Sequence, residues 1–280
     1  MEQNVRENKM GIMPVNRLLL NMAVPMIVSM LVQALYNVVD SVFVAKLSED
    51  ALNAVSLAFP VQKLMISVGV GTGVGINALL SRSLGQKEQD KVDRTAMNGL
   101  LLAAISCLVF MLFGLTCGQR FYAIQTDIQT IISYGGDYLT ICCGMCFGAF
   151  AQITLERILQ ATGRTFYTMI TQATGALINI ILDPIFIFGF HLDVAGAALA
   201  TVLSQMASCA FVLLSLRRKR MPVRLRWGRM ELHIVRRVLA FGLSPFLIIA
   251  TDSILLIVLN TVLQRYGGPE LGDTLVTCAT

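Results

Sequence analysis

The 280-residue chain is 55% hydrophobic and only 14% charged, whereas soluble domains carry about 25% charged residues. This composition excludes an ordinary soluble domain and predicts an all-α, polytopic membrane helical bundle. The net charge of +5 does not indicate nucleic-acid binding, because the basic residues lie at the ends of apolar spans.

The first predicted span runs from about residue 15 to residue 44 and carries polar side chains along one face. Their three- and four-residue spacing aligns them on a helix: Gln33, Tyr36, Asn37 and Asp40. Such a stripe is costly against lipid, so Asp40 is a candidate intramembrane carboxylate. The charged run that begins at Lys46 leaves open a position for Asp40 near the water interface. Pro25 predicts a bend in this span.

The second predicted span, about residues 51 to 80, contains four alternating glycines: Gly69, Gly71, Gly73 and Gly75. A nucleotide-binding loop is disfavoured, since no strand precedes these glycines and no Lys-Ser/Thr pair follows them. The first and third glycines, like the second and fourth, form a small-x-x-x-small pair, which predicts close helix packing in lipid. Whether Lys63, the one charge in this span, snorkels or reaches a cavity stays open.

Apolar stretches at about residues 95–115 and 128–155 predict spans three and four. Gly85 is a plausible stop for the helix that precedes span three. Cys143 and Cys146 form a C-x-x-C pattern in span four, but no second pair lies nearby. We interpret these cysteines as small packing residues rather than as zinc ligands or a redox pair.

The fifth predicted span, from Thr171 to Phe190, carries the second candidate carboxylate, Asp183. Asn179 precedes it by four residues, which places both side chains on one helix face. A carboxylate at the centre of a span costs about 3 kcal/mol or more and often marks an ion pathway, so we interpret the pair as a cation or proton site. The alternative is a structural Asp that caps the backbone broken by Pro184.

Two more spans are predicted at about residues 194–216 and 234–263, followed by a turn at Tyr266–Gly272. Alternate loops hold eighteen of the 22 Lys and Arg residues, the opposite loops hold three, and Lys63 is the last. Because cytoplasmic loops are enriched in basic residues, this distribution places the N-terminus in the cytoplasm.

An internal repeat is indicated by Arg17–Pro25 and Arg237–Pro245, which share the Arg-to-Pro spacing and both open a long span. Parallel repeats of this kind build two-lobed transporters. In this register Asn260 takes the place of Asp40. We therefore predict a six-helix lobe in residues 1–216, a basic cytoplasmic connector in 217–233 and the start of a second lobe in 234–280.

Five motifs occur in a characteristic order: RLLLNMAVPMIVSMLVQALYNVVDSVFVAKL, SRSLGQK, ILQATGR, NIILDPIFIFG and VAGAALATVLSQ. With them the chain resembles the multidrug and toxic compound extrusion (MATE) family from Met13 to about Leu263, and most closely its bacterial branch of the DNA-damage-inducible type. The resemblance implies twelve helices in two six-helix lobes and export of amphipathic, often cationic drugs in exchange for H+ or Na+. The chain ends after its seventh predicted span, so we expect it to be truncated.

The resemblance also implies which residues form a cation site in the first lobe: Asp40, Asn179, Asp183 and Thr201. It implies a neighbouring polar lining, for which we take Gln33, Tyr36, Asn37, Tyr138 and Glu156. Relatives often carry Asn close to the position of Glu156. Two neighbouring carboxylates in a low dielectric can share one proton, or Asp40, Asn179 and Asp183 can coordinate Na+. Either event would bias the bends expected at Pro25 and Pro184.

We therefore expect a cation-coupled antiporter of the bacterial plasma (inner) membrane that exports drugs or toxins, needs no cofactor besides its coupling ion and is not an enzyme. We expect it to be embedded in the lipid bilayer. A second lobe or chain is also an expected partner, because one lobe cannot alternate access alone. Two alternatives stay open: an inactive half-transporter, and a lipid-linked oligosaccharide flippase, although only Lys63 could supply the basic cavity typical of flippases. An intramembrane aspartyl protease is disfavoured, since no Gly-x-Gly-Asp run is present.

Overall fold

The computed structural model describes residues 13–126, 128–216, 223 and 230–279. All regular structure in these ranges is helical, which confirms the predicted fold class. The elements in chain order are α2 (Val15–Ala45), α3 (Glu49–Gly85), α4 (Gln89–Gln125), α5 (Gln129–Gly144), α6 (Phe147–Ala161), α7 (Thr165–Pro184), the π-helical η1 (Ile185–Gly189), α8 (Asp193–Leu216) and α9 (Leu232–Ala279). Six helical stretches are long and apolar enough to cross a membrane, and α5 with α6 makes up to seven.

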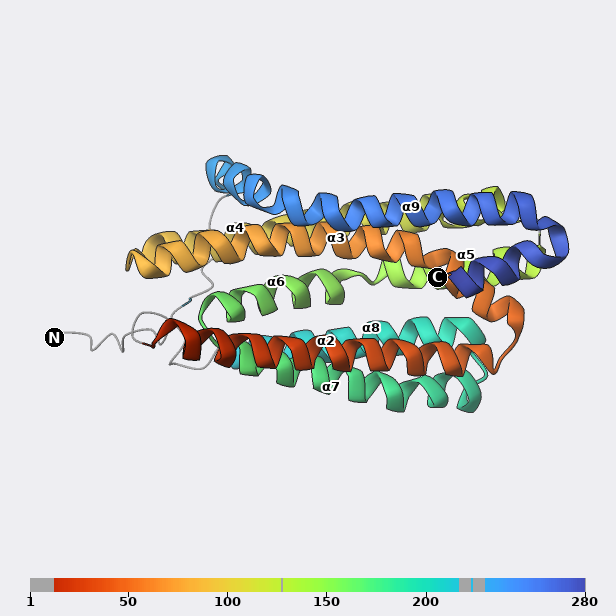
Figure 1. Cartoon of the computed structure of the whole chain (residues 1–280), viewed down its shortest axis with the longest axis horizontal. Helices are drawn as coiled ribbons and strands as arrows, with labels where there is room; N and C mark the ends of the chain where they lie inside the picture. Colours follow the sequence, from red (N-terminus) through yellow and green to blue (C-terminus); the bar gives the residue numbers. More distant parts are fainter. Residues whose placement is uncertain (1–12, 127, 217–222, 224–229, 280) are drawn as a thin grey trace.

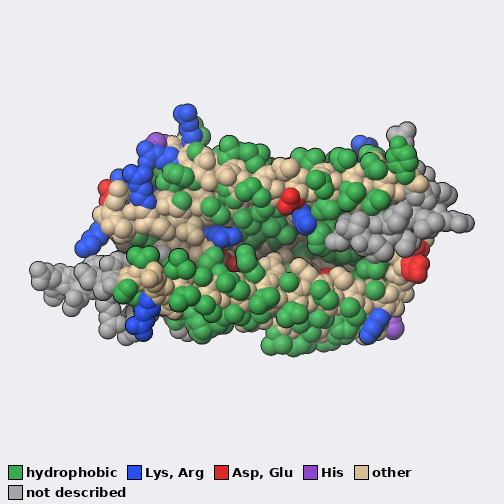
Figure 2. All heavy atoms as spheres, viewed as in Figure 1, with side chains coloured by type: hydrophobic (Ala, Val, Ile, Leu, Met, Phe, Trp, Pro, Cys, Tyr) green, Lys and Arg blue, Asp and Glu red, His purple; other side chains and the backbone are tan. Residues whose placement is uncertain are grey.

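The helices form two layers (Figure 1). One layer contains α3 and α9 with α4, the other contains α2, α7 and α8, and α6 lies between them. Figure 2 shows apolar side chains over the middle of the molecule, many Lys and Arg side chains near the end where α2 begins, and a hollow between the layers in which acidic side chains are visible. The outer surface thus suits lipid, and the hollow holds charge.

The alternating glycines of α3 pack against two different helices, which confirms the prediction of close packing. A Cβ atom at Gly73 would lie 2.7 Å from Cγ of Arg157 in α6. A Cβ atom at Gly71 would lie 2.8 Å from Cβ of Phe246 in α9, and one at Gly75 would overlap the backbone of Val238. One glycine pair therefore faces α6 and the other faces α9, as alternation along a helix allows.

Predicted span four is two helices rather than one. α5 and α6 meet at a 46° bend, and Met145, between them, has φ −111° and ψ 22° instead of helical values. A Cβ atom at Gly144 would contact nothing within 4 Å, so packing does not hold the chain straight there. The buried Sγ atoms of Cys107 and Cys146 lie 3.2 Å apart at this bend, and the six described cysteines are all free, which agrees with a packing role.

Helix α7 begins earlier than predicted and changes its geometry where predicted. Gly163, with φ 74°, makes the turn before it, so the helix starts at Thr165 rather than near Thr171. The α-helical pattern ends at Pro184, and a π-helical turn follows to Gly189. Because proline lacks an N–H, the hydrogen-bond ladder must be interrupted there. By contrast, α2 continues through Pro25 as one helix, and a bend at Pro25 stays a prediction.

The residues expected to turn, Tyr266–Gly272, keep helical geometry, because α9 runs from Leu232 to Ala279. Figure 1 shows that α9 instead bends sharply near its C-terminal end. The sequence Gly-Gly-Pro at 267–269 explains why a break was expected, since these residues disfavour helix. Glycine and proline also bend helices without ending them.

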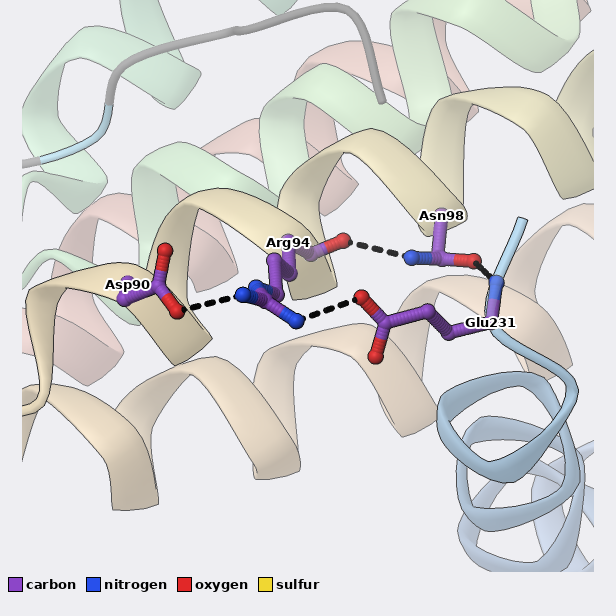
Figure 3. Close-up of polar contacts among 4 residues, drawn as sticks. All are labelled: Asp90, Arg94, Asn98 and Glu231. Atoms are coloured by element: carbon purple, nitrogen blue, oxygen red, sulfur yellow. Dashed lines mark hydrogen bonds and ion pairs between the residues drawn. The ribbon is translucent and has the colours of Figure 1, made fainter. Parts of the chain in front are cut away.

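A polar network fastens the start of α9 to α4 (Figure 3). The side chain of Asn98 accepts a hydrogen bond from the backbone N–H of Glu231 at 2.7 Å, and donates to the carbonyl of Arg94 at 2.9 Å. Arg94 pairs at 2.9 Å with both Asp90 and Glu231. The ion pairs are exposed and contribute little, whereas Asn98 is only 2% exposed, so its hydrogen bond is the stronger restraint on α9.

We expect Asn98→Ala to loosen the first turn of α9. The Glu231 N–H would lose its acceptor, which should lower the free energy of local opening by about 1 kcal/mol. This N–H should therefore exchange with solvent deuterium roughly fivefold faster. Hydrogen–deuterium exchange with mass spectrometry of the Glu231 peptide measures this. Thr116→Ala is the control, since the exposed hydroxyl of Thr116 donates to the carbonyl of Leu112 within α4. Unchanged exchange in Asn98→Ala would show that other contacts hold the start of α9.

Candidate cation site between α2, α7 and α8

Two polar residues of α7 are fully enclosed within the helix bundle. Asp183 is 0% exposed and Asn179 is 1% exposed. The side-chain amide of Asn179 donates to Oδ1 of Asp183 at 3.3 Å and lies 3.4 Å from the hydroxyl of Thr201 in α8. The four-residue spacing on α7 thus aligns the pair as predicted, and α8 supplies the third polar group.

Asp40 approaches this pair from α2, which packs along α7. The two carboxylates are near enough for the charge of Asp40 to act on Asp183. Oδ1 of Asp40 is itself buried, although the residue as a whole is half-buried. Asp40 therefore lies with one oxygen buried, close enough to Asp183 for its charge to act on that carboxylate.

Three buried oxygen atoms in this group have no hydrogen-bond partner. They are Oδ1 of Asp40, Oδ1 of Asn179 and Oδ2 of Asp183. Leaving a buried polar atom unpaired costs about 1–3 kcal/mol, so such atoms are rare and call for a reason. Carboxylate and amide oxygens are hard ligands that suit Na+, and a carboxylate pair also suits a shared proton. The donor set therefore fits either coupling ion that the sequence suggested.

Two tyrosines adjoin the carboxylates. Tyr36 of α2 hydrogen-bonds Gln33, and the charges of Asp40 and Asp183 reach its ring hydroxyl. Tyr138 of α5 is 3% exposed and lies within reach of the charge of Asp40. The structure thus brings both tyrosines near Asp40, and their role as a lining stays a prediction.

One lining residue escaped the sequence analysis. Gln62 of α3 donates from Nε2 to the hydroxyl of Tyr138 at 3.0 Å, which links α3 to the site. The available signal was an amide in the middle of an apolar span, directly before Lys63. Lys63 itself is half-buried, with its ammonium 5.5 Å from the centre of the Phe59 ring. Asn37 is exposed on α2, and its backbone carbonyl accepts a hydrogen bond from the hydroxyl of Ser41.

Glu156 does not belong to this lining, which corrects its assignment from the sequence. Its carboxylate oxygens accept hydrogen bonds from Gln152 at 3.0 Å and from Gln172 at 2.9 Å. Gln172 precedes Asp183 by eleven residues, or about 16 Å along α7. The spacing along one helix separates the two acidic groups, and a single sequence cannot show which helix lies opposite Glu156.

Comparison with known proteins gives consistent matches. The MatE family model matches residues 25–185, more than half of the chain. The multidrug export protein MepA of Staphylococcus haemolyticus (strain JCSC1435) is 26% identical over 252 residues, which are 89% of this chain and 56% of the relative. The chain thus spans a little over half the length of this curated relative.

Two solved structures show the same fold. One is the outward-facing conformation of a multidrug resistance MATE family transporter of the MOP superfamily, with a TM-score of 0.83 and 28% identity over 94% of this chain and 58% of that chain. The other is the inward-facing conformation of a multidrug resistance MATE family transporter of the MOP superfamily. Its TM-score is 0.84, with 28% identity over 94% of this chain and 60% of that chain. The described helices therefore resemble both conformations equally well.

Proposed function

Because the chain belongs to the MATE family of multi-pass membrane transporters, we propose that it carries the coupling-cation site of a drug exporter. The observation that supports this most directly is the group of unpartnered buried oxygens on Asp40, Asn179 and Asp183. An intramembrane carboxylate with an unpaired buried oxygen is expensive, and a bound Na+ or a shared proton would lower that cost. Thr201 would complete the site through its hydroxyl.

Export would proceed by alternating access, with cargo held between two lobes that rock against each other. The supporting observation is that the chain, most of which is the first lobe, resembles inward- and outward-facing relatives with nearly equal TM-scores, as expected if that lobe moves largely as one body. The second lobe would come from a longer chain or from a partner chain. The cargo would be small amphipathic drugs, by analogy with the multidrug exporter MepA.

Coupling would act on the helix segments next to the site. Asp183 directly precedes Pro184, where α7 changes from α-helical to π-helical geometry. A cation that binds Asp40 and Asp183 also joins α2 to α7, so its binding would favour one arrangement of the two helices. The excess of basic residues on alternate loops supports a cytoplasmic N-terminus in a bacterial plasma membrane.

Equilibrium binding of tetraphenylphosphonium to the purified 280-residue chain tests this function. We expect the chain to bind the phosphonium. We also expect one of two ions to weaken this binding about tenfold: Na+ added at constant pH and ionic strength, or protons added in the absence of Na+. That effect corresponds to a coupling free energy of about 1.4 kcal/mol, within the usual range. Binding that responds to neither ion would contradict the coupling. A chain that binds no phosphonium would contradict the export of cationic drugs.

A further inference from the structure

Two buried cysteines meet where α4 passes the bend between α5 and α6. Cys107 is 8% exposed and Cys146 is 1% exposed, and their Sγ atoms lie 3.2 Å apart. The Sγ atom of Cys146 also lies 3.5 Å from the backbone carbonyl oxygen of Cys107. Among the six described cysteines, no other two thiols are in such contact. Cys107 and Cys146 are therefore the thiol pair that this fold brings together.

The packing next to the pair holds α4 against the start of α6. The rings of Phe110 and Phe150 lie about one turn further along the two segments, with their centroids 5.7 Å apart. Both cysteines and Phe150 belong to one buried apolar cluster, which also includes Met65 of α3. Contact at two successive turns opposes sliding of one helix along the other, so the two sulfur atoms should stay near each other.

The partner of Cys146 is not its neighbour in the C-x-x-C pattern. Cys143 instead packs against Gly114 of α4, where an added Cβ atom would overlap Cβ of Cys143. The chain also leaves helical geometry at Met145, between the two cysteines of the pattern. The contact that matters joins residues 39 positions apart in the chain, so spacing alone does not reveal it.

A disulfide between Cys107 and Cys146 needs only a small movement. The Sγ atoms, now 3.2 Å apart, would approach by roughly 1.2 Å to reach the length of a disulfide bond. Cys146 directly follows the non-helical Met145, and a Cβ atom at Gly144 would contact nothing within 4 Å. The chain beside Cys146 therefore has room to adjust while α4 stays in place.

We propose that Cys107 and Cys146 are a modification site for small lipid-soluble disulfides, which convert the two thiols into a disulfide that ties α4 to the bend between α5 and α6. The first cysteine attacks the reagent, forms a mixed disulfide and releases half of the reagent as a thiol, which carries away the cysteine proton. The second cysteine then displaces the other half, again as a thiol. Two cysteines are oxidised and one reagent disulfide is reduced, so no further oxidant is needed.

Burial separates the rates of these two steps. Thiols buried in apolar surroundings react slowly, so the first step should need a reagent that dissolves in the membrane. Such a reagent would approach along Leu108 and Phe147, which follow the two cysteines in the chain and are exposed. The second step is intramolecular between neighbouring sulfur atoms, and such steps are strongly favoured. The mixed disulfide should therefore not accumulate at either cysteine.

Dithiodipyridine, a small lipid-soluble disulfide, tests the proposal on the purified 280-residue chain. We expect peptide mapping by mass spectrometry to find Cys107 joined to Cys146, with no pyridylthio adduct on either. In Cys107→Ser, Cys146 should instead keep its adduct, because the second step has lost its thiol. Cys117→Ser is the matched control, since Cys117 is half-buried elsewhere on α4, and this variant should form the disulfide as the unsubstituted chain does.

Stable adducts on both Cys107 and Cys146 in the unsubstituted chain would overturn the proposal. So would a main disulfide between two other cysteines, or a pair that stays unmodified while Cys117 reacts. The tie to the bend has its own readout: the disulfide should slow deuterium exchange in the peptide that spans residues 144–147 roughly threefold or more, and dithiothreitol should reverse this. Exchange that is equal with and without the disulfide would overturn that part of the proposal.

Discussion

Asp183→Asn should abolish the response of phosphonium binding to Na+ and to pH. The substitution keeps the size of the side chain but removes the charge and one of the unpartnered oxygens beside Asp40 and Asn179. A buried ion that loses a charged ligand loses several kcal/mol, so we expect the coupling ion to bind at least about 100-fold more weakly, near 2.8 kcal/mol. Phosphonium affinity measured against Na+ concentration and against pH reports the change.

Thermal unfolding of the same variant gives an independent readout. An ion that binds only the folded chain raises its stability as the ion concentration rises, and Asp183→Asn should remove this dependence. Asp137→Asn is the matched control, because Asp137 is exposed on α5 outside the site. If Asp40→Asn and Asp183→Asn both retain the ion response of the unsubstituted chain, the coupling ion binds elsewhere.

Gly75→Leu should separate α9 from α3 and cause the largest loss of stability among these predictions. A Cβ atom at Gly75 would lie 2.8 Å from the carbonyl carbon of Val238, and one at Gly71 would meet Phe246. The obstacle at Gly75 is backbone, which cannot turn aside as a flexible side chain does. We expect a loss of about 3 kcal/mol, or roughly 6–12 °C in the midpoint of thermal unfolding in detergent.

Gly85→Leu is the control for this substitution, since a Cβ atom at Gly85 would contact nothing within 4 Å. The reciprocal variant Gly242→Leu should resemble Gly75→Leu, because Gly242 lies against the backbone of Gly71 from the other side. A midpoint in Gly75→Leu equal to that of Gly85→Leu would show that α9 does not depend on backbone contact with α3.

The sequence predicts most features that depend on one helix alone. The shared face of Asn179 and Asp183, the paired glycines of α3 and the change of geometry at Pro184 follow from spacing or from backbone chemistry. The partners on other helices are harder to predict. Spacing singled out Asp40, but its grouping with Asp183, like that of Thr201, came from resemblance to a family. Gln62 was missed, because periodicity fixes a direction around one helix but not which helix lies there.

Breaks between helices were the least predictable feature. The bend between α5 and α6 lies in an apolar run that contains Gly144 and Gly148, and nothing in its composition separates it from a continuous span. At Tyr266–Gly272 the difference is the opposite, because residues that disfavour helix lie inside α9 and helical geometry continues through them. Glu156 was placed with the wrong group for a related reason: its position depends on how far along α7 its partner Gln172 lies from Asp183.

The contact between Gly75 and Val238 also sets an order for assembly during synthesis. These residues are 163 positions apart in the chain, so at about 5–20 residues per second the ribosome needs about 8–33 s to deliver α9 after α3. Throughout this interval the Gly71–Gly75 face of α3 is without its partner and meets lipid or the insertion machinery. Slowed translation between α3 and α9 would prolong this stage, during which another small-residue helix in the membrane could occupy the face first.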